Sequence, residues 1–392
     1  MLSGLFPSEH GVLKGPKRTR GRDGSLTDVL PDSAPHVAEA LTGSGWRCGA
    51  FFNNVQLERY TGFHRGFHTY APICGKVDRQ LEMIDEWIAL EPSKPFFVYV
   101  HLMETHWPYK PRRRHVEMFG GSRDTSRFEN FSALDFARLR RSLKSGEATL
   151  SESDLDDLVR MYDASVRRLD GKIKILQEIL EKHGVCDDTA LVITADHGEE
   201  FLDHGSIGHG HSLHVEATRV PLVIFSPQQD RTARYSEPTS MVDLPRTLLS
   251  LAGANVPFPG CDLIQGSNTS PPYCELSIGR SFHRAIAVER WRLHRHAWLD
   301  SECDSTPMDF IARVRRGEMA AQEAVRLYDL ETDPREQSNL ADDSRHLATV
   351  RRLTQAMDLP GRLDGSTILT EFPQVEVDES VVTRLRELGY IE

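Results

Sequence analysis

The chain has 392 residues, of which 39% are hydrophobic and 27% are charged. These values are typical of a folded globular protein, and the length suffices for one large α/β domain with a smaller one appended, or for two ordinary domains. The formal net charge of -11 argues against a nucleic-acid partner, because binding to a phosphate backbone needs a basic face. No segment approaches the roughly 18 consecutive apolar residues of a membrane span, and the N-terminus lacks the apolar core of a signal peptide, which favours a cytoplasmic location.

The first half of the chain predicts alternating helices and strands. Residues 37–44 are expected to form a short amphipathic helix, followed by a strand over residues 46–52. A second helix is predicted over residues 80–90, where two prolines then end it, and the apolar run 95–101 is typical of a buried parallel strand. In open α/β sheets ligands collect at the carboxyl ends of strands, so the end of this run should lie at a crevice.

The middle of the chain continues the same alternation. A long helix is predicted over residues 153–182, because a serine and acidic residues stand at its start and a glycine follows its end. Residues 189–194 and 219–226 read as further strands, and residues 243–252 as a helix. We expect residues 96–100, 191–194 and 222–225 to be neighbouring buried strands.

A segment rich in Pro, Gly, Ser and Thr, residues 255–272, is interpreted as a linker. It divides the chain into an α/β domain over residues 1–270 and a smaller α+β subdomain over residues 271–392. For the second part the pattern predicts strands at 284–289 and 291–298 and a final helix near 380–388.

Two other residue types have simple interpretations. The arginines within residues 112–114 and 138–141 could form an anion-attracting rim, but ordinary solvated surface charge is the favoured reading. Six scattered cysteines show no C-x-x-C spacing, so they are expected to be free thiols rather than zinc ligands or a redox pair.

The strongest chemical signal is the segment 194–221, which reads T-A-D-H-G-E-E-F-L-D-H-G-S-I-G-H-G-H-S-L-H-V-E-A-T-R-V-P. Asp196 and His197 follow directly on a predicted strand, where a carboxylate and an imidazole nitrogen can both turn onto one cation. Gly198 lets the backbone approach closely. An isolated Asp-His-Gly would be only a turn, but here it lies at the start of a dense histidine cluster. We therefore predict that Asp196 and His197 bind a divalent metal ion.

Three further histidines in this segment have no assigned role. His204, His211 and His214 are read as surface residues rather than metal ligands.

The segment resembles the sulfatase family, whose members carry S/T-x-D-H/N-G-E after a strand, then an H-G or K-G element and R-V-P-L. Five other segments resemble family motifs in the same order: residues 2–12 (S-L-x-T-G-L-Y-P-x-x-H-G-V), 100–109 (H-x-x-x-P-H-x-P-Y), 241–249 (V-D-x-x-P-T-L-L), 327–340 (L-Y-D-L-x-x-D-P-x-E-x-x-N-L) and 385–390 (L-x-x-L-G-Y). Together they span nearly the whole chain.

The resemblance implies an alkaline-phosphatase-like fold, with a central, mostly parallel sheet flanked by helices and a smaller C-terminal α+β subdomain. It places Asp196 and His197 as the second pair of metal ligands. It also places His106 and His209 at positions that contact the anionic group of the substrate, where an imidazole can supply a proton or a charge. An asparagine pair, Asn53 and Asn54, is more simply read as part of a loop than as a substrate contact.

Two parts of the family pattern are not found in these residues. One is an early strand ending in paired Asp residues. The other is Cys-x-Pro-Ser-Arg, or its Ser or Thr equivalent; in sulfatases its first Cys or Ser is oxidised to the formylglycine nucleophile. Because the first motif match begins near Met1, we expect an N-terminal truncation, with the nucleophile just upstream; a degenerate gene is the other reading. Asp196 and His197 alone offer too few ligands for Ca²⁺, which takes 6 to 8 oxygens.

The sequence therefore predicts a sulfuric ester hydrolase that is inactive as written. The expected substrate is a small-molecule or glycan sulfate ester. The expected metal is Ca²⁺, and Mn²⁺ or Zn²⁺ are left open because imidazole suits softer ions. Two alternatives are a phosphodiester or phosphonate monoester hydrolase of the same superfamily and a catalytically silent oxyanion-binding protein. The sequence gives no indication of oligomeric state.

Overall fold

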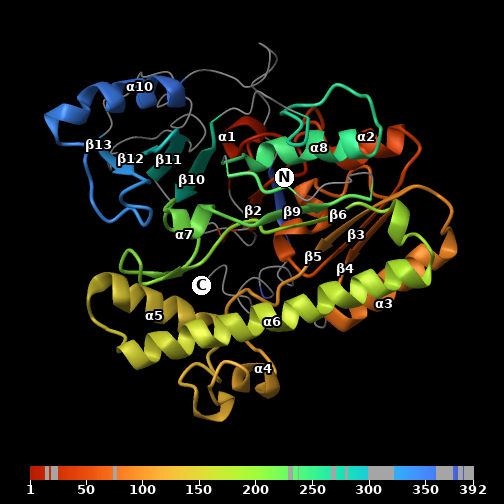
Figure 1. The fold of residues 1–392 in the computed structure, drawn as a ribbon, viewed down its shortest axis with the longest axis horizontal. Coiled ribbons are helices and arrows are strands. Elements are labelled where there is room, and N and C mark those ends of the chain that lie inside the picture. The colour runs from red at the N-terminus through yellow and green to blue at the C-terminus, as the bar shows by residue number, and fades with distance from the viewer. Residues whose placement is uncertain are drawn as a thin grey trace.

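The computed structural model of the chain describes residues 1–13, 17–18, 25–73, 77–227, 233–236, 238–265, 271–278, 281–298, 322–358, 374–377 and 383. Figure 1 shows a larger part built around parallel strands and, beside it, a smaller part built from a second sheet and a helix. Among the described residues no helix has both the length and the apolar character needed to cross a bilayer. The four cysteines in this part of the structure, Cys48, Cys186, Cys261 and Cys274, are free thiols.

The larger part contains a three-stranded parallel sheet in the order β4-β3-β5. Its strands are β3 (Arg47–Phe52), β4 (Thr69–Pro72) and β5 (Phe96–His101). The central strand β3 is buried along its whole length, as its apolar sequence predicts. The pairing of Phe52 with His101 aligns the carboxyl ends of β3 and β5, so the residues that follow both strands emerge at the same edge.

Helices cover this sheet on both faces, which is the layered arrangement expected for an α/β domain (Figure 1). On one face, Val37 and Leu41 of α2 (Val37–Gly43) pack with Leu249 of α8 (Leu244–Leu251). On the other face, α3 (Val77–Leu90) and α6 (Glu152–Lys182) pack through Ile84 and Ile179. Ser151 caps α6 and forms a capping box with Asp154, which explains why the long predicted helix begins there.

A second pair of strands, β6 (Leu191–Thr194) and β9 (Leu222–Phe225), is antiparallel. The prediction that β5, β6 and β9 are neighbouring buried strands is confirmed for the pairing of β6 with β9 and is wrong in two other respects. No hydrogen-bonded ladder joins β5 to β6, and each has only one strand partner among the described residues. Their side chains are only partly buried, and Val223 and Phe225 of β9 are 53% and 58% exposed. A strand buries its side chains only where neighbouring elements cover both faces and edges.

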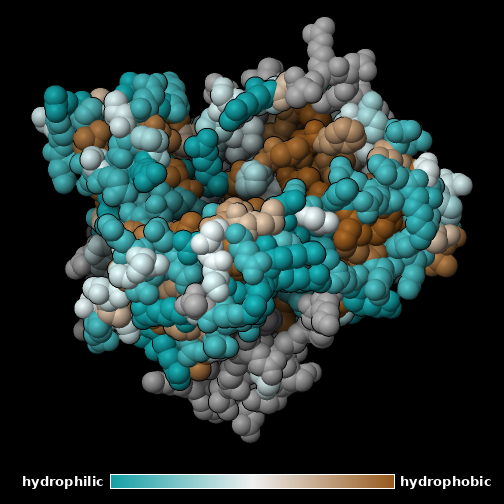
Figure 2. All heavy atoms as spheres, turned by 60° about the horizontal axis from the view of Figure 1, so that its bottom comes forward, coloured by the Kyte–Doolittle hydropathy of each residue, from teal (hydrophilic) through white to brown (hydrophobic). Residues whose placement is uncertain are grey.

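A cleft of about 550 Å³ lies beside the first residues of β5 and β6. Its walls include Phe96 and Phe97 of β5, Val192 of β6 and Leu248 of α8. On the face that Figure 2 shows, hydrophobic side chains in brown lie within hollows that hydrophilic side chains surround. The cleft therefore separates two strand edges whose backbone groups have no ladder partner in the described part of the sheet.

Between β5 and α6 the chain forms a helical region that the sequence did not predict. It contains α4 (Arg113–Glu117) and α5 (Ala133–Ser145). Phe136 of α5 packs with Trp107, Tyr109 and Met161 of α6 in a separate hydrophobic core. This core supports the segment that follows β5 and holds it against the segment that follows β6.

The smaller part is an antiparallel sheet in the order β10-β11-β12-β13, with α10 (Leu347–Asp358) packed on one face. Its strands are β10 (Tyr273–Ile278), β11 (Ser281–Val288), β12 (Trp291–Trp298) and β13 (Gln322–Asp329). Ile286, Leu293 and Leu327 lie opposite one another on adjacent strands and pack against Leu353 of α10. The two strands predicted here are present. Of the helix predicted near residues 380–388 the structure describes only residue 383, so this helix and the division at residue 270 stay predictions.

The remaining elements are short. They are α1 (Pro7–His10), β1 (Lys17–Arg18), β2 (Ser25–Asp28), β7 (Glu200–Phe201), β8 (Ile207–Gly208), α7 (Val215–Thr218) and β14 (Gln374–Val377).

Candidate active site and metal centre

Polar side chains from the ends of three strands gather at one edge of the larger part. His101 is the last residue of β5, Asn54 follows β3, and Asp196 and His197 follow β6. His101 is held from both sides, since its Nδ1 lies 3.1 Å from the Tyr99 hydroxyl and its Nε2 lies 3.3 Å from Asn54 Nδ2. The strand-end rule for α/β proteins therefore locates this cluster.

Asp196 presents its carboxylate to this cluster and remains accessible, with 44% of its side chain exposed. Partial removal from water raises the pKa of Asp196, but attraction by His197, His101 and His209 outweighs that effect, and the pKa is lowered below its usual value. Asp196 therefore stays ionised, which a metal-binding carboxylate requires.

Three histidine rings form a continuous wall next to Asp196. The ring centroids of His197 and His209 are 3.9 Å apart, and those of His209 and His106 are 5.1 Å apart. The structure thus brings together the four residues selected from the sequence, although they lie up to 103 positions apart between His106 and His209. Burial, with repulsion from His197, lowers the pKa of His209 to about 3. Burial, with repulsion from His209, lowers the pKa of His106 to about 4.

Glu199 is a site residue to which the sequence analysis gave no role. Its Oε1 lies 3.1 Å from His209 Nδ1, and only 5% of its side chain is exposed. Burial raises the pKa of Glu199 to about 7, against the attraction of His197 and His106. Its place in the D-H-G-E motif was the signal that could have identified it. Glu199 fixes which nitrogen of His209 faces the protein and leaves Nε2 for the opposite side.

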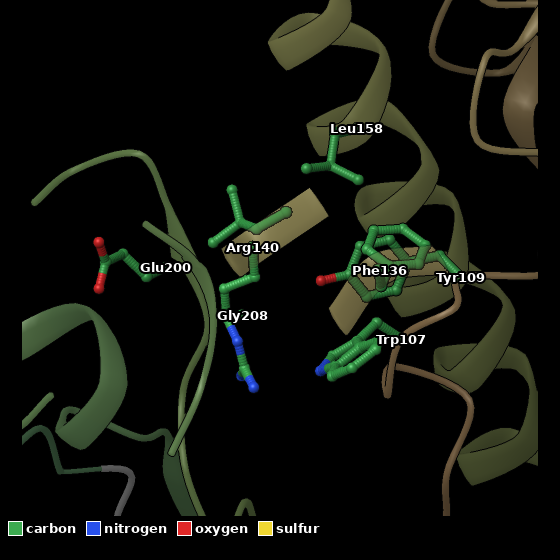
Figure 3. A pocket seen from close by; sticks show the side chains of 8 residues that line it. Trp107, Tyr109, Phe136, Arg140, Leu158, Glu200 and Gly208 are labelled. Carbon is green, nitrogen blue, oxygen red and sulfur yellow. The ribbon is translucent and has the colours of Figure 1, made fainter. Parts of the chain in front are cut away.

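A small cavity lies behind His209, and Figure 3 shows its lining. The indole of Trp107 and the guanidinium of Arg140 extend into it from different elements (Figure 3). Arg140 Nη1 donates to the backbone oxygen of His209 over 3.0 Å. The reading of residues 138–141 as solvated surface charge is therefore wrong for Arg140, because the fold turns this side of α5 toward the site. Trp107 Nε1 is buried and has no hydrogen-bond partner in the part of the chain that the structure describes.

The other histidines of the segment do not join the metal cluster, but they are not surface residues either. His211 Nε2 lies 3.0 Å from Glu200 Oε2, and Glu200 also accepts hydrogen bonds from two backbone amides of its own loop. The surface interpretation of His204, His211 and His214 was wrong because tertiary contacts with buried carboxylates cover them. Glu200 thus joins His211 to backbone amides of the loop that precedes His209.

His204 and His214 meet Glu336 from the segment after β13, with ligand-type atoms within 4.8 Å of one another. The two imidazole rings are stacked at 3.5 Å and nearly parallel, at 11°. A metal ion lies close to the plane of each imidazole that binds it, and two stacked planes do not intersect between the rings. Arg292 Nε also lies 2.8 Å from Glu336 Oε1. This cluster is therefore a charged latch between the two parts of the molecule rather than a metal site.

Asp196 and His197 have the geometry of a partial divalent-cation site. His197 Nδ1 donates to the backbone oxygen of Gly198 over 2.9 Å, which leaves Nε2 as a ligand on the side of Asp196 Oδ1, 3.8 Å away. Within the described residues no third His, Cys, Asp or Glu completes a ligand group around them. A carboxylate and an imidazole fit a divalent metal but supply only part of its coordination sphere.

Gly198 has no room for a side chain. A Cβ atom at this position would lie 2.0 Å from the backbone oxygen of Glu216 in α7. We expect Gly198→Ala to lower the free energy of unfolding by about 3 kcal/mol, because the clash is with backbone and the loop must move. Gly171→Ala in α6 is the matched control, since nothing lies within 4 Å of its Cβ position and we expect about 0.5–1 kcal/mol of stabilisation. Urea unfolding of both variants measures this, and equal effects would contradict it.

Comparison with known proteins identifies relatives. The family model described as Sulfatase matches residues 1–254. Arylsulfatase K of Xenopus laevis is 25% identical over 289 residues, which cover 67% of this chain and 52% of that protein. Choline-sulfatase of Rhizobium meliloti is 25% identical over 285 residues, which cover 69% of this chain and 51% of that protein. The chain spans about half the length of these curated relatives.

Solved structures show the same fold. A protein in complex with its substrate D-glucosamine-2-N,6-O-disulfate has a TM-score of 0.64 at 16% identity and covers 94% of this chain and 88% of its own. The phosphonate monoester hydrolase of Agrobacterium radiobacter has a TM-score of 0.64 at 17% identity and covers 96% of this chain and 88% of its own. These similarities confirm the predicted alkaline-phosphatase-like fold. Since the family model also matches well over half of the chain, the protein belongs to the sulfatase family of hydrolases.

Proposed function

We propose that this protein hydrolyses a sulfate ester once its metal site is completed by a further strand. The observation that carries the proposal is the convergence of Asp196, His197, His106 and His209 on one strand edge of a sulfatase-family chain. Asp196 and His197 would hold part of a divalent metal site, with Ca²⁺ as the first choice. When bound, the metal would stabilise negative charge on the oxygens of the ester group.

The two substrate-facing histidines have distinct surroundings that suit proton transfer. His106 Nδ1 donates to the backbone oxygen of Trp107, and His209 Nδ1 faces Glu199. Both imidazoles are neutral near pH 7 because their pKa values are lowered. An arriving sulfate group adds negative charge beside them and raises these pKa values, so either ring gains a proton that it can pass to the leaving oxygen. Glu199 in its ionised form stabilises the imidazolium of His209.

The cleft beside β5 and β6 supports the proposal of an additional strand. One parallel strand placed there would pair with the edges of both and would end beside His101 and Asp196. The family resemblance implies an early strand ending in paired Asp residues, followed by the formylglycine nucleophile. We propose that such a strand supplies the remaining metal ligands and the nucleophile.

The test compares two forms of the protein on 4-nitrophenyl sulfate. We expect negligible turnover by the 392-residue chain, because a covalent nucleophile cannot be replaced by the remaining residues. An N-terminally extended form that carries the strand should turn the ester over, and His209→Ala in that form should lower kcat by roughly 10²- to 10⁴-fold. Turnover by the 392-residue chain that His197→Ala abolishes would contradict the need for the strand.

The same assay separates the alternative functions. A phosphodiester or phosphonate monoester hydrolase would prefer a 4-nitrophenyl ester of that class over the sulfate. The assay includes such esters because the fold is similar to that of a phosphonate monoester hydrolase. An extended form that binds inorganic sulfate without turning over any ester would be a silent oxyanion-binding protein. Comparing turnover of a sulfated glycan with that of 4-nitrophenyl sulfate distinguishes a glycan ester from a small-molecule ester.

A further inference from the structure

A second polar pocket lies between the His209 loop and the C-terminal sheet. Its volume is about 120 Å³, and it is lined by the loop residues after His209 and by β11, β12 and β13. Among the described residues, the lining contains five histidines and three arginines and no acidic residue. The histidines are His211, His214, His283, His294 and His296.

The strand register places cationic side chains on one face of this sheet. His283 of β11 pairs with His296 of β12, and His294 pairs with Arg326 of β13. The rings of His283 and His296 stack with centroids 3.7 Å apart. Side chains two residues apart on a strand share a face, so this face is opposite to that of Leu293, which packs on α10. The basic face is therefore turned toward the larger part of the molecule.

The charges around the stacked pair are unbalanced. The pKa of His283 is lowered to about 4 by burial and by repulsion from His296, His294, Lys144 and Arg326. Burial also lowers the pKa of His296, with Arg326 and Lys144 repelling the charged form. No carboxylate is among the main causes of either shift.

Three acids close to the pocket already have partners. Glu336 is bonded to His214, Glu200 is bonded to His211, and Glu323 pairs with two arginines of the lining, Arg284 and Arg295. None of these three carboxylates is paired with the stacked histidines or with Arg326. Among the described residues, His296 Nε2 is also buried without a hydrogen-bond partner. An anion would supply both the missing negative charge and the missing hydrogen bond.

We propose that this pocket binds an oxyanion group, such as a sulfate, phosphate or carboxylate, and that in the active protein it receives a second anionic group of the substrate. The second half of the proposal rests on the proposed function. It is supported by continuity, because His211 lines the pocket and its Nδ1 lies 3.2 Å from the backbone oxygen of His209. A substrate with one ester group at His209 would extend toward the basic face.

The binding test uses inorganic sulfate and calorimetry on the 392-residue chain. We expect the double variant His283→Gln and His296→Gln, and separately Arg326→Gln, to weaken sulfate binding at the pocket by roughly tenfold, because each removes a charge-assisted contact. Arg351→Gln on α10 is the matched control and should leave binding unchanged. Unfolding temperatures verify that the variants are folded. Unchanged sulfate binding in the pocket variants would overturn the proposal.

The pH dependence has a defined sign. The groups that face the stacked pair are His294, Arg326, Lys144 and the loop histidines His211 and His214, with Glu336 and Glu200 already bonded. A bound anion raises the pKa of the stacked pair, so binding takes up protons and sulfate affinity falls as pH rises. We expect roughly tenfold weaker binding at about pH 7.5 than at about pH 5.5. Affinity that is independent of pH would exclude the two imidazoles as the binding groups.

Two further measurements distinguish a substrate group from a free anion in the pocket, and failure of the pocket proposal from failure of the proposed function. In the extended form, Arg326→Gln should weaken the binding of D-glucosamine-2-N,6-O-disulfate more than the binding of 4-nitrophenyl sulfate, because only the first compound has two anionic groups. Equal losses would restrict the pocket to free oxyanions and overturn its role in substrate binding. His209→Ala should remove ester binding at the catalytic site and leave sulfate binding at the pocket intact. If the pocket binds sulfate but the extended form turns over no ester, the anion site is supported and the proposed function is contradicted.

Discussion

Asp196→Ala should abolish tight divalent-cation binding and activity in an N-terminally extended form of the protein, whereas His211→Ala should leave the metal content nearly unchanged. Asp196 follows β6 directly, its carboxylate is accessible, and its Oδ1 faces His197 Nε2. His211 instead contacts Glu200 and has no path to the same cation. Removing a carboxylate ligand from a hard cation removes both charge and geometry, so we expect at least a 100-fold loss of affinity.

Metal analysis of the purified variants, followed by calcium and manganese titration, provides the measurement. His211→Ala leaves the buried Glu200 without one partner, so its unfolding temperature must be recorded alongside. A modest loss of stability with full metal content is the expected pattern for His211→Ala. Equal metal loss in the two variants would show that the ligands are assigned wrongly.

Glu336→Ala should be among the most destabilising single substitutions in the described structure. The Glu336 side chain has no exposed surface, and it is bonded to His214 Nδ1 at 2.7 Å, to Arg292 Nε at 2.8 Å and to the backbone amide of Val215. Removing it leaves the guanidinium of Arg292 without its ionic partner in a buried position. We expect a loss of about 3–5 kcal/mol, as for other buried pairs that lose one partner. Urea unfolding measures the change.

Glu331→Ala is the matched control, because Glu331 is 65% exposed and pairs with Arg290 at the surface. A surface pair contributes about 0–1 kcal/mol, so this variant should be nearly neutral. If Glu336→Ala and Glu331→Ala lose the same stability, the buried contacts of Glu336 do not stabilise the protein more than a surface ion pair does.

The buried contacts of Glu336 also predict how the free energy of unfolding depends on pH. Burial raises the pKa of Glu336, but hydrogen bonds from His214 and His294 and the charge of Arg292 lower it by far more, so it lies well below its usual value. A carboxyl whose pKa is lowered on folding contributes stability above its unfolded pKa of about 4.3, and that contribution is lost as pH falls below this value. The stability difference between the natural chain and Glu336→Ala should therefore narrow below about pH 4.

Local sequence patterns were sufficient for most of the parallel core. The period of apolar residues and the caps located α2, α3, α6 and α8, and continuous apolar runs located β3, β5, β6 and β9. The D-H-G-E segment identified Asp196 and His197 because a strand end and two ligand-type side chains coincide there. Such signals are local, and a single sequence carries them in full.

Other features depended on contacts that no local pattern reveals. The helix α5 was not predicted, and its role in placing Arg140 beside His209 follows from packing against Trp107 and α6. His101 stood at a predicted strand end, but only the pairing of β3 with β5 brings Asn54 to it. Glu336, 122 positions after His214, comes to lie beside that histidine and bonds it, so a residue read as exposed is buried.

The sequence by itself determined the family, the strand ends that precede His106 and the Asp196–His197 pair, and the order of the main helices and strands, because each depends on residues close together in the chain. Only the tertiary structure decided that β5 and β6 are separate, that Glu199 orients His209, and that His283, His296 and Arg326 form one basic face. These are properties of strand pairing and of burial, which depend on residues that are far apart in the sequence and become neighbours only in the folded chain.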